Sequence, residues 1–534
     1  MDSKRDMTRF AAVFAGGTML SRVSGLVRDM IFFHFIKGEA LGAFVFAFSL
    51  PNMLRDMLGE GATNAALIPV FAEKREKEGE EAYRRAVASV MGFMMLILSV
   101  ITVLGVALMP AVPGLLRMLT VVTGEDLPQN EAELSELVRL LQWTFPYVLM
   151  ICMTVFASGP LFLAKRYGSA SWSPVILNVV LAVFCVGFAR VFVNPAWALV
   201  LGIWVGGLGT WAYMFWDMHR ATGVLLPRFD FRNPAVGRVL LLMLPVIAGQ
   251  SAGEVNKVIE RMFAASLGMD KVVALYASNR LVQLPLSVFG VAVSVAILPS
   301  ISRAMARGEV GVVRDTLMHG FRQSFFLVFP AMVGLVALRE PLVRLLFERG
   351  KFGPEDTRLA ADALGYAALG LLSFSWVKVS VQGFYAAQQT HIPVIAATAS
   401  MVLNILLNIA LVRPMGYLGL ALSTSISYTI NFLVVYTLLC RKYGRLWDAD
   451  FAGALGRMLL AALLMGVCAS WVSGAAEAHV GTASLAGRAA GVIFSIGTAV
   501  GVYSGTCALL RVSEMRQISA LFFRKAGGIP TNRD

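Results

Sequence analysis

The segment that decides the fold runs from Leu20 to Pro69 and reads LSRVSGLVRDMIFFHFIKGEALGAFVFAFSLPNMLRDMLGEGATNAALIP. It places Arg22, Arg28 and Arg55 in stretches that are otherwise apolar enough to cross a membrane. A charge at the centre of a transmembrane helix costs about 2.5 to 3.5 kcal/mol, so three arginines facing lipid would cost on the order of 10 kcal/mol. They must face a partner acid, a water-filled cavity or an anionic ligand, and we favour the latter two.

The composition indicates a polytopic membrane protein. The chain has 534 residues, of which 57% are hydrophobic and 15% charged, whereas ordinary soluble domains are about 45–50% apolar and about 25% charged. The net charge of +13 comes from Lys and Arg residues that lie between apolar spans. A nucleic-acid partner is therefore not expected, because such proteins gather basic residues on one solvated face.

The chain shows no sign of an enzyme. Its five cysteines lie in or beside apolar segments without the short spacings of metal or redox sites, and no HExxH, Walker or GxSxG motif is present. We expect no catalytic residues and no cofactor.

Hydropathy predicts an all-α fold with fourteen transmembrane helices. An even number of spans puts both termini on one side, and the distribution of Lys and Arg places that side in the cytoplasm. The basic cytoplasmic loops include the one expected after the second span, with Lys74, Arg75, Lys77, Arg84 and Arg85. Residues 338–358, which contain FERGKF, fall on the outer side despite their basic residues. Their apolar spacing predicts a short amphipathic helix at the membrane interface.

An internal repeat divides the chain. SRVSGLVRDM (Ser21–Met30) aligns with GEVNKVIERM (Gly253–Met262), and the helix that follows each contains a Leu-Pro, at Pro51 and Pro285. Two pseudo-symmetric six-helix lobes with broken helices are typical of alternating-access transporters. The predicted organisation is an N-lobe at 1–218, a cytoplasmic linker at 219–237, a C-lobe at 238–440, two added helices at 441–511 and a cytoplasmic tail at 512–534.

Four arginines are the candidate ligand-binding residues: Arg22, Arg28, Arg55 and, in the second half, Arg280. If they converge on one cavity they suit a diphosphate, since guanidinium offers a planar and permanently charged fork to phosphate oxygens.

Nearby acids and glycines are candidate pairing and gating residues. Asp29 is expected to hold Arg22 or a neighbouring arginine when no ligand is bound, and Glu60 lies between Gly59 and Gly61, which offer a hinge. A purely structural alternative pairs the arginines with acids of the repeat helix. Those pairs would be Arg22 with Glu254 and Arg28 with Glu260.

A second polar cluster could hold a small cation. Asn404 and Asn408 lie four residues apart on one helix, Thr424 lies on the next, and Glu260 could add one carboxylate. The alternative is that these residues have a structural role, because Asn and Thr side chains also hold membrane helices together.

The motifs resemble one family. The chain resembles the MurJ/MviN family, the bacterial lipid II flippases of the multidrug/oligosaccharidyl-lipid/polysaccharide exporter superfamily. The resemblance rests on four stretches: SRVSGLVRD, AFSLPNMLRDMLGEGATNAALIPVFAE, YASNRLVQLPLSVFGVAVSVAILPSISR and FERGKF. The likeness covers nearly the whole chain. It implies a multi-pass, monomeric protein of the bacterial cytoplasmic (inner) membrane that flips undecaprenyl-pyrophosphate-linked precursor to the periplasmic leaflet for cell-wall synthesis.

The resemblance also implies roles for residues. The essential arginines of the family fall on Arg22, Arg28, Arg55 and Arg280, with Asp29 and Glu60 as nearby acids. The two added helices would form a groove for the polyprenyl tail, in contact with membrane lipids.

The proposed sodium site of the family falls on Glu260, Asn404, Asn408 and Thr424. Here the chain departs from members that carry two aspartates, which puts Na⁺ coupling in doubt and leaves the membrane potential as another driving force. Two alternatives stay open: an exporter of another lipid-linked oligosaccharide or drug/cation antiporter of the superfamily, and a non-transporting scaffold.

Overall fold

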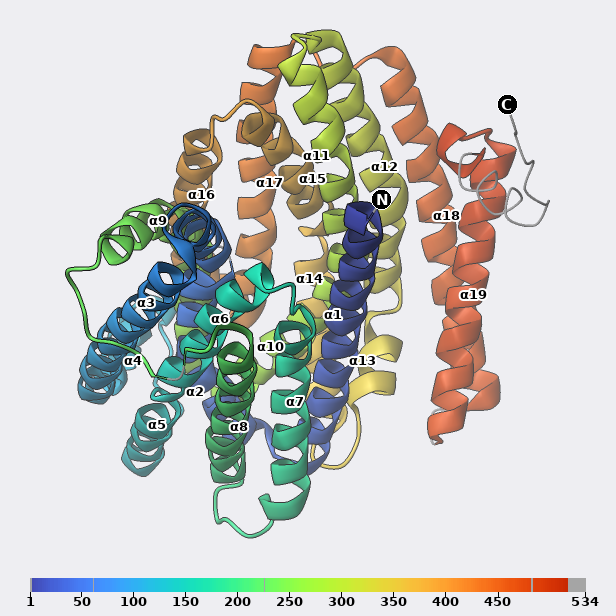
Figure 1. Cartoon of the computed structure of the whole chain (residues 1–534). Helices are drawn as coiled ribbons and strands as arrows, with labels where there is room; N and C mark the ends of the chain where they lie inside the picture. Colours follow the sequence, from blue (N-terminus) through green and yellow to red (C-terminus); the bar gives the residue numbers. More distant parts are fainter. Residues whose placement is uncertain (1, 61, 225, 482–483, 517–534) are drawn as a thin grey trace. The chain divides into compact units, whose positions relative to one another are not determined.

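The computed structural model describes residues 2–60, 62–224, 226–481 and 484–516, and these are almost entirely helical (Figure 1). The helices pack into two compact units. Unit 1 comprises Met1–Val273 and Arg349–Asp356, and unit 2 comprises Ala274–Glu348 and Thr357–Asp534. The all-α fold expected from composition is confirmed.

The described part of unit 1 is built from eleven helical elements and the start of α10. These are α1 (Asp2–Phe35), α2 (Gly38–Arg55), η1 (Asp56–Glu60), α3 (Ala62–Leu108), η2 (Met109–Ala111), α4 (Val112–Thr123), α5 (Glu131–Thr144), α6 (Tyr147–Leu163), α7 (Gly168–Phe188), α8 (Ala196–Thr222), α9 (Pro234–Leu267) and α10 (Met269–Pro285).

Close helix packing in unit 1 relies on small residues. α7 packs between α1 and α8, and α8 presents Gly202 and Gly206, one turn apart, to it. A Cβ atom at Gly202 would lie 3.1 Å from the Leu181 side chain, and one at Gly206 would lie 2.9 Å from that of Leu177. Small residues four apart let two membrane helices approach closely, which is how α7 acquires a fixed position beside α1.

The basic segment after the second predicted span is helical, although we expected a loop. α3 continues from Ala62 through this segment to Leu108 with one break at Gly79, whose φ of 83° disfavours residues other than glycine. Side chains four residues apart stabilise its exposed part, since Lys74 pairs with Glu78 and Lys77 with Glu73.

Unit 2 holds the remaining elements. They are η3 (Leu286–Gly290), α11 (Val291–Ala306), α12 (Val310–Ala337), α13 (Arg339–Phe347), α14 (Pro354–Ala368), α15 (Leu371–Ala386), α16 (His391–Met415), α17 (Tyr417–Tyr443), α18 (Ala449–Val480) and α19 (Leu485–Leu509).

An aromatic cluster forms the centre of unit 2. The ring of Phe321 on α12 lies 5.9 Å from that of Trp376 and 6.1 Å from that of Phe432. α18 packs on α12 and pairs with α19 (Figure 1), and the Tyr503 hydroxyl donates a hydrogen bond to the Phe326 carbonyl at 2.9 Å. The added helices are thus part of the folded unit.

An ion pair fixes the chain just after α19. The Nε atom of Arg322 donates to Glu514 at 2.7 Å, and Ser513 donates to the other oxygen at 2.9 Å. Burial alone would raise the pKa of Glu514, but the hydrogen bonds from Arg322 and Ser513 outweigh it and lower that pKa.

Both repeat-related helices are broken, as the prolines predict. α2 contains Pro51 and leads into the π-helical turn η1, while α10 ends at Pro285 and leads into the π-helical turn η3. π-helical turns are rare and are frequently found at functional sites. Each unit therefore carries one such interruption.

The FERGKF segment lies against α1. The amides of Lys351 and Phe352 donate to the His34 and Phe33 carbonyls at 3.1 Å each, which satisfies carbonyls at the C-terminal end of α1. Gly350 makes this approach possible, since a Cβ there would lie 2.2 Å from the His34 carbonyl oxygen. The predicted short amphipathic helix before it is present as α13.

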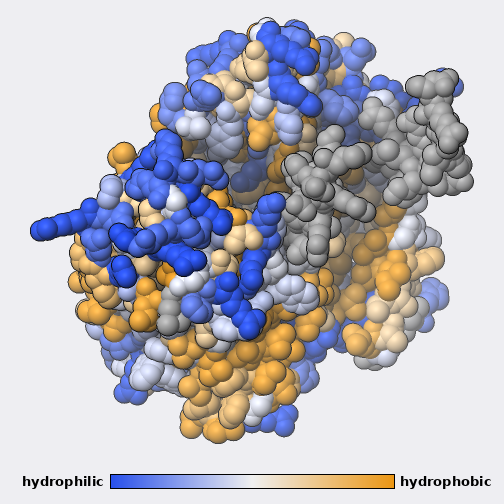
Figure 2. Space-filling view, viewed as in Figure 1, coloured by the Kyte–Doolittle hydropathy of each residue, from blue (hydrophilic) through white to orange (hydrophobic). Residues whose placement is uncertain are grey.

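Eleven described helices are long and apolar enough to cross a membrane, or twelve if α14 and α15, bent by 40°, form one span. α1 and α2 are not among the helices that pass this test of the described residues, so the count of fourteen stays a prediction. Apolar side chains cover much of α7, α8 and the α18–α19 pair on the face seen in Figure 2, as expected for lipid-facing helices.

The predicted lobe boundaries also stay a prediction. They begin the C-lobe at residue 238, whereas α9 packs against α2, α3 and α4 in unit 1.

We predict that a cysteine replacing Gly353, in a variant of this protein without its five native cysteines, reacts with a membrane-impermeant thiol reagent in intact cells. A side chain there would meet only Asp356 Oδ2, at 3.9 Å. The matched control is Lys77→Cys, at a 72% exposed side chain of the basic α3 segment, which should react only after lysis. The reverse pattern would refute cytoplasmic termini.

Candidate substrate site

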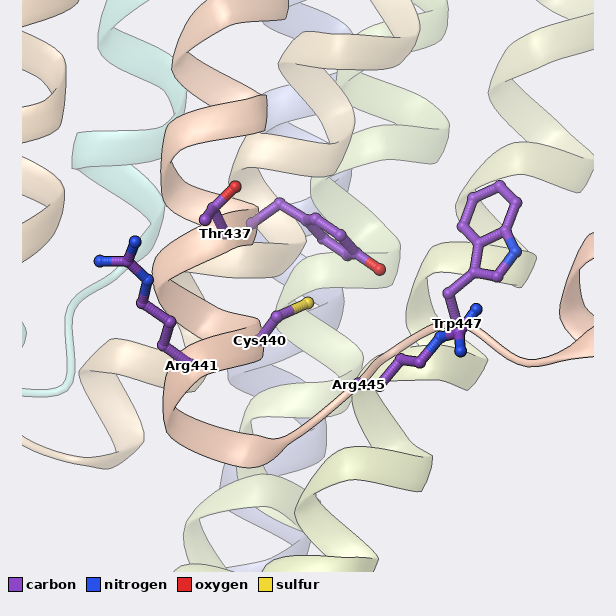
Figure 3. A pocket seen from close by; sticks show the side chains of 6 residues that line it. Thr437, Cys440, Arg441, Arg445 and Trp447 are labelled. Atoms are coloured by element: carbon purple, nitrogen blue, oxygen red, sulfur yellow. The ribbon is translucent and has the colours of Figure 1, made fainter.

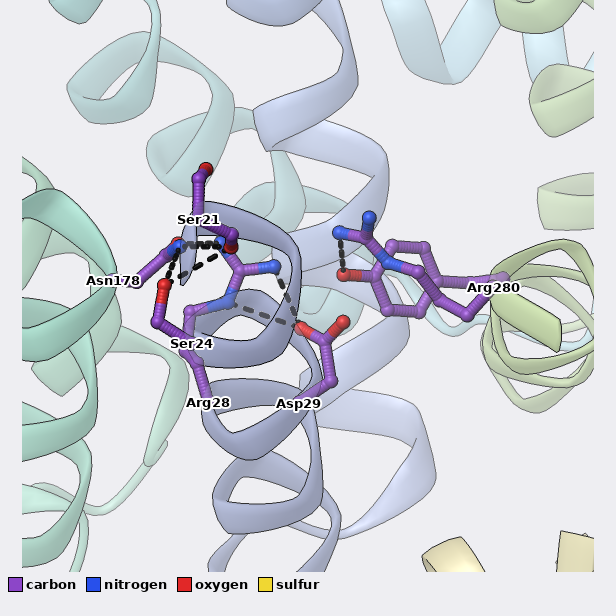
Figure 4. A network of polar contacts seen from close by, with 7 residues as sticks. Ser21, Ser24, Arg28, Asp29, Asn178 and Arg280 are labelled. Atoms are coloured by element: carbon purple, nitrogen blue, oxygen red, sulfur yellow. Dashed lines mark hydrogen bonds and ion pairs between the residues drawn. The ribbon is translucent and has the colours of Figure 1, made fainter. Parts of the chain in front are cut away.

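Arg28 is buried and held on three sides. Its Nε and Nη2 atoms donate to Asp29 Oδ1 at 3.0 and 2.7 Å, and Nη1 donates to Asn178 Oδ1 on α7 at 2.8 Å (Figure 4). Its guanidinium lies over the Phe32 ring, 5.3 Å from the centroid. Arg28 is 7% exposed and Asp29 0%. The ion pair offsets the energetic cost of burying the charged guanidinium of Arg28.

Asn178 is oriented by α1 itself. Its amide nitrogen donates to the Ser21 carbonyl at 3.2 Å and to the Ser24 hydroxyl oxygen at 2.9 Å (Figure 4). Those bonds turn its carbonyl oxygen toward Arg28, because the amide cannot present both groups in the same direction. The result is a preorganised network that spans α1 and α7.

Arg22 lies two turns before Arg28 and has different surroundings. It is exposed, and within the described part of the chain its side chain forms no hydrogen bond or ion pair. Its guanidinium therefore keeps all five N–H donors for a ligand or for water.

Arg55 repeats the pairing seen at Arg28. Its Nε and Nη2 atoms donate to Asp56 Oδ1 at 2.9 and 2.6 Å, and the two side chains are 30% and 28% exposed. Sequence reasoning missed Asp56, although Arg-Asp-Met occurs twice, at 28–30 and at 55–57. In unit 1 two candidate arginines are thus already neutralised by the next residue.

Arg280 belongs to α10 and contacts a neutral partner. Its Nη2 donates to the Tyr276 hydroxyl at 2.7 Å, and its guanidinium lies 4.9 Å from the centroid of the Tyr276 ring (Figure 4). The tyrosine orients the arginine and leaves its charge uncompensated by this contact. Tyr276 was another residue that sequence reasoning missed, and its position one turn before Arg280 is the signal that could have found it.

The structural alternative receives no support at Glu254. Its carboxylate pairs with Lys257 at 2.6 Å, while Arg22 has no acid partner among the described residues. Glu260 is buried on α9 at 9% exposure.

Part of the predicted hinge cannot be placed. Gly61 lies outside the described residues, and so does the side chain of Glu60. The backbones of Gly59 and Glu60 belong to η1.

The neutral members of the candidate cation cluster meet in unit 2. Asn404 Nδ2 donates to the Thr424 hydroxyl at 3.3 Å, and Asn408 Nδ2 donates to Asn404 Oδ1 at 3.1 Å. Ser423 donates to Asn408 Oδ1. Each amide oxygen thus already accepts a hydrogen bond, in a network whose asparagines are 2% and 0% exposed.

These neutral residues fit a helix contact better than a cation site. A sodium ion would have to draw the amide oxygens away from N–H and O–H donors, and among the described residues no group of three His, Cys, Asp or Glu side chains gathers to hold a metal ion.

Comparison with known proteins identifies the family. Residues 34–490 match the family described as "Lipid II flippase MurJ". The probable lipid II flippase MurJ of Haemophilus influenzae is 32% identical over 84% of this chain and 89% of its own length, and that of Rhizobium meliloti is 30% identical over 97% and 98%.

Solved structures agree on the fold. A lipid II flippase MurJ in an inward closed conformation matches with a TM-score of 0.73 at 22% identity, covering 93% of this chain and 99% of that one. An inward-facing multidrug resistance MATE transporter of the MOP superfamily matches with a TM-score of 0.63 at 16% identity, covering 82% and 98%. The chain therefore belongs to the lipid II flippase MurJ family.

Proposed function

We propose that this protein moves lipid II across the membrane by binding its pyrophosphate with arginines of both repeats. The chain is a multi-pass membrane transporter of a bacterial family, and its function is that of a lipid II flippase in peptidoglycan synthesis. The observation that carries the proposal is the family match over residues 34–490, together with arginines on α1, α2 and α10 that suit an anionic headgroup.

The residues of the site take different roles. Arg22 is accessible and makes the first contact with the pyrophosphate. Arg28 and Arg55 are held by Asp29 and Asp56 until phosphate oxygens compete for the same guanidinium edges, and Arg280 contributes from α10. Exchange of a carboxylate for a phosphate keeps each guanidinium paired throughout, which avoids the cost of a bare buried charge.

The remaining parts of the proposal concern location and the lipid tail. The protein acts as a monomer in the cytoplasmic (inner) membrane, with both termini in the cytoplasm and the headgroup released to the periplasmic side. The polyprenyl tail lies along α18 and α19, where Leu460, Leu463, Val467 and Trp471 are exposed apolar residues.

The first test uses Arg22. Arg22→Ala should reduce lipid II affinity roughly tenfold to a hundredfold, since a charge-assisted contact contributes about 1.5 to 3 kcal/mol, and Arg22→Lys should lose less because it keeps the charge. Growth of cells depleted of their own lipid II flippase and the membrane level of each variant are the measurements. Recovery of Arg22→Ala by removing Glu254 would contradict the proposal.

A second test separates binding by Arg28 from its structural pairing. Asp29→Ala should lower the membrane level, because removing one partner of a buried pair costs about 3 to 5 kcal/mol. The double variant Arg28→Ala with Asp29→Ala buries no charge, so it should accumulate and still fail to flip lipid II. Normal flipping by the double variant would mean that the pair is structural only.

The third test concerns sodium. The neutral network of Asn404, Asn408 and Thr424 is complete without a cation, so replacing Na⁺ with K⁺ at constant membrane potential should leave the flipping rate unchanged. A collapse of flipping in K⁺, restored by Na⁺, would show this interpretation to be wrong.

A further inference from the structure

A hollow lies at the end of α17, in a part of unit 2 that contains none of the candidate substrate residues. Its volume is about 520 Å³, within the roughly 300–1,000 Å³ of small-molecule sites. It is lined by Tyr436, Thr437, Cys440, Arg441, Arg445 and Trp447. The lining combines aromatic and basic side chains, a pairing that marks membrane–water interfaces.

The connection between α17 and α18 is held in place by two buried residues. Tyr443 and Leu446 are buried at 6% and 0% exposure, and the Tyr443 hydroxyl donates to the Gly383 carbonyl at 2.8 Å. Between and after them, Arg445 and Trp447 point outward and are exposed. Asp448 then caps α18, because its side chain accepts a hydrogen bond from the Phe451 amide at 2.7 Å.

The two arginines border the hollow on different sides. In Figure 3 Cys440 projects toward Arg445 and Trp447, whereas Arg441 points away on the other side of α17. Within the described residues neither Arg441 nor Arg445 forms a hydrogen bond or ion pair. Two available guanidinium groups beside an apolar hollow favour a ligand with a phosphate and an attached apolar part.

We propose that this hollow binds the phosphodiester headgroup of an anionic phospholipid from the cytoplasmic leaflet. Arg445 and the Tyr436 hydroxyl contact the phosphate, the Trp447 ring covers the glycerol region, and Arg441 adds attraction from the opposite rim. The segment has the charge that the positive-inside rule assigns to the cytoplasm, where basic pockets between membrane helices recognise anionic headgroups. The site is separate from the flipping of lipid II and does not rest on that function.

The test uses the full chain in nanodiscs of phosphatidylglycerol and phosphatidylcholine, with retained lipids counted by native mass spectrometry. Each arginine near an anionic surface raises affinity roughly fivefold, so Arg441→Ala with Arg445→Ala should weaken phosphatidylglycerol binding about 25-fold and remove one retained molecule. Both positions are exposed, so the double variant should fold. The matched control is Arg307→Ala, an exposed arginine at the end of α11, which should retain the wild-type number.

Several outcomes would overturn the proposal. If the double variant retained as much phosphatidylglycerol as the wild-type protein, Arg441 and Arg445 would not belong to a lipid site. If Arg307→Ala lost as much phosphatidylglycerol as the double variant, the effect would come from general surface charge. Retention of phosphatidylcholine at the same level would mean that the hollow selects only acyl chains. Displacement of phosphatidylglycerol by excess inorganic phosphate would assign the site to a free anion.

Discussion

The energetic cost of burying a guanidinium group is the constraint on which unit 1 depends. Arg28 on α1 is 7% exposed, and Asp29 and Asn178 accept its hydrogen bonds. Asn178 belongs to α7, and the glycines of α8 allow α7 to pack closely. The position of one arginine is thus tied to the packing of three helices, α1, α7 and α8.

The same constraint explains why the candidate arginines differ. Arg28 and Arg55 are followed directly by an aspartate, so each is neutralised by the next residue. Arg22 has no such neighbour and is exposed, and Arg280 has the neutral Tyr276 hydroxyl. In the mechanism we propose, a pyrophosphate meets accessible positive charge first at Arg22, and two further guanidinium groups become available in exchange for their carboxylates.

Much of this could be predicted from the sequence where the cause is local. The prolines at 51 and 285 predicted broken helices, which are present as π-helical turns, and the apolar spacing of residues 338–358 predicted the helix α13. Asn178 could not be found, because its role depends on the contact of α7 with α1, 150 residues away. Asp56 was visible as the residue after Arg55 but was overlooked, whereas the pairing of Asp29 with a neighbouring arginine was expected. The helical course of α3 was missed because charged segments resemble loops until their ion pairs four residues apart are counted.

The most direct measurement of the central claim is the binding of lipid II and of its monophosphate analogue to the purified protein and to Arg22→Ala. If arginines bind the pyrophosphate, the wild-type protein binds lipid II more tightly than the monophosphate analogue. Arg22→Ala then loses most of this preference, while its affinity for the analogue changes less. Equal binding of the two lipids by the wild-type protein, or an unchanged preference in Arg22→Ala, would contradict the account.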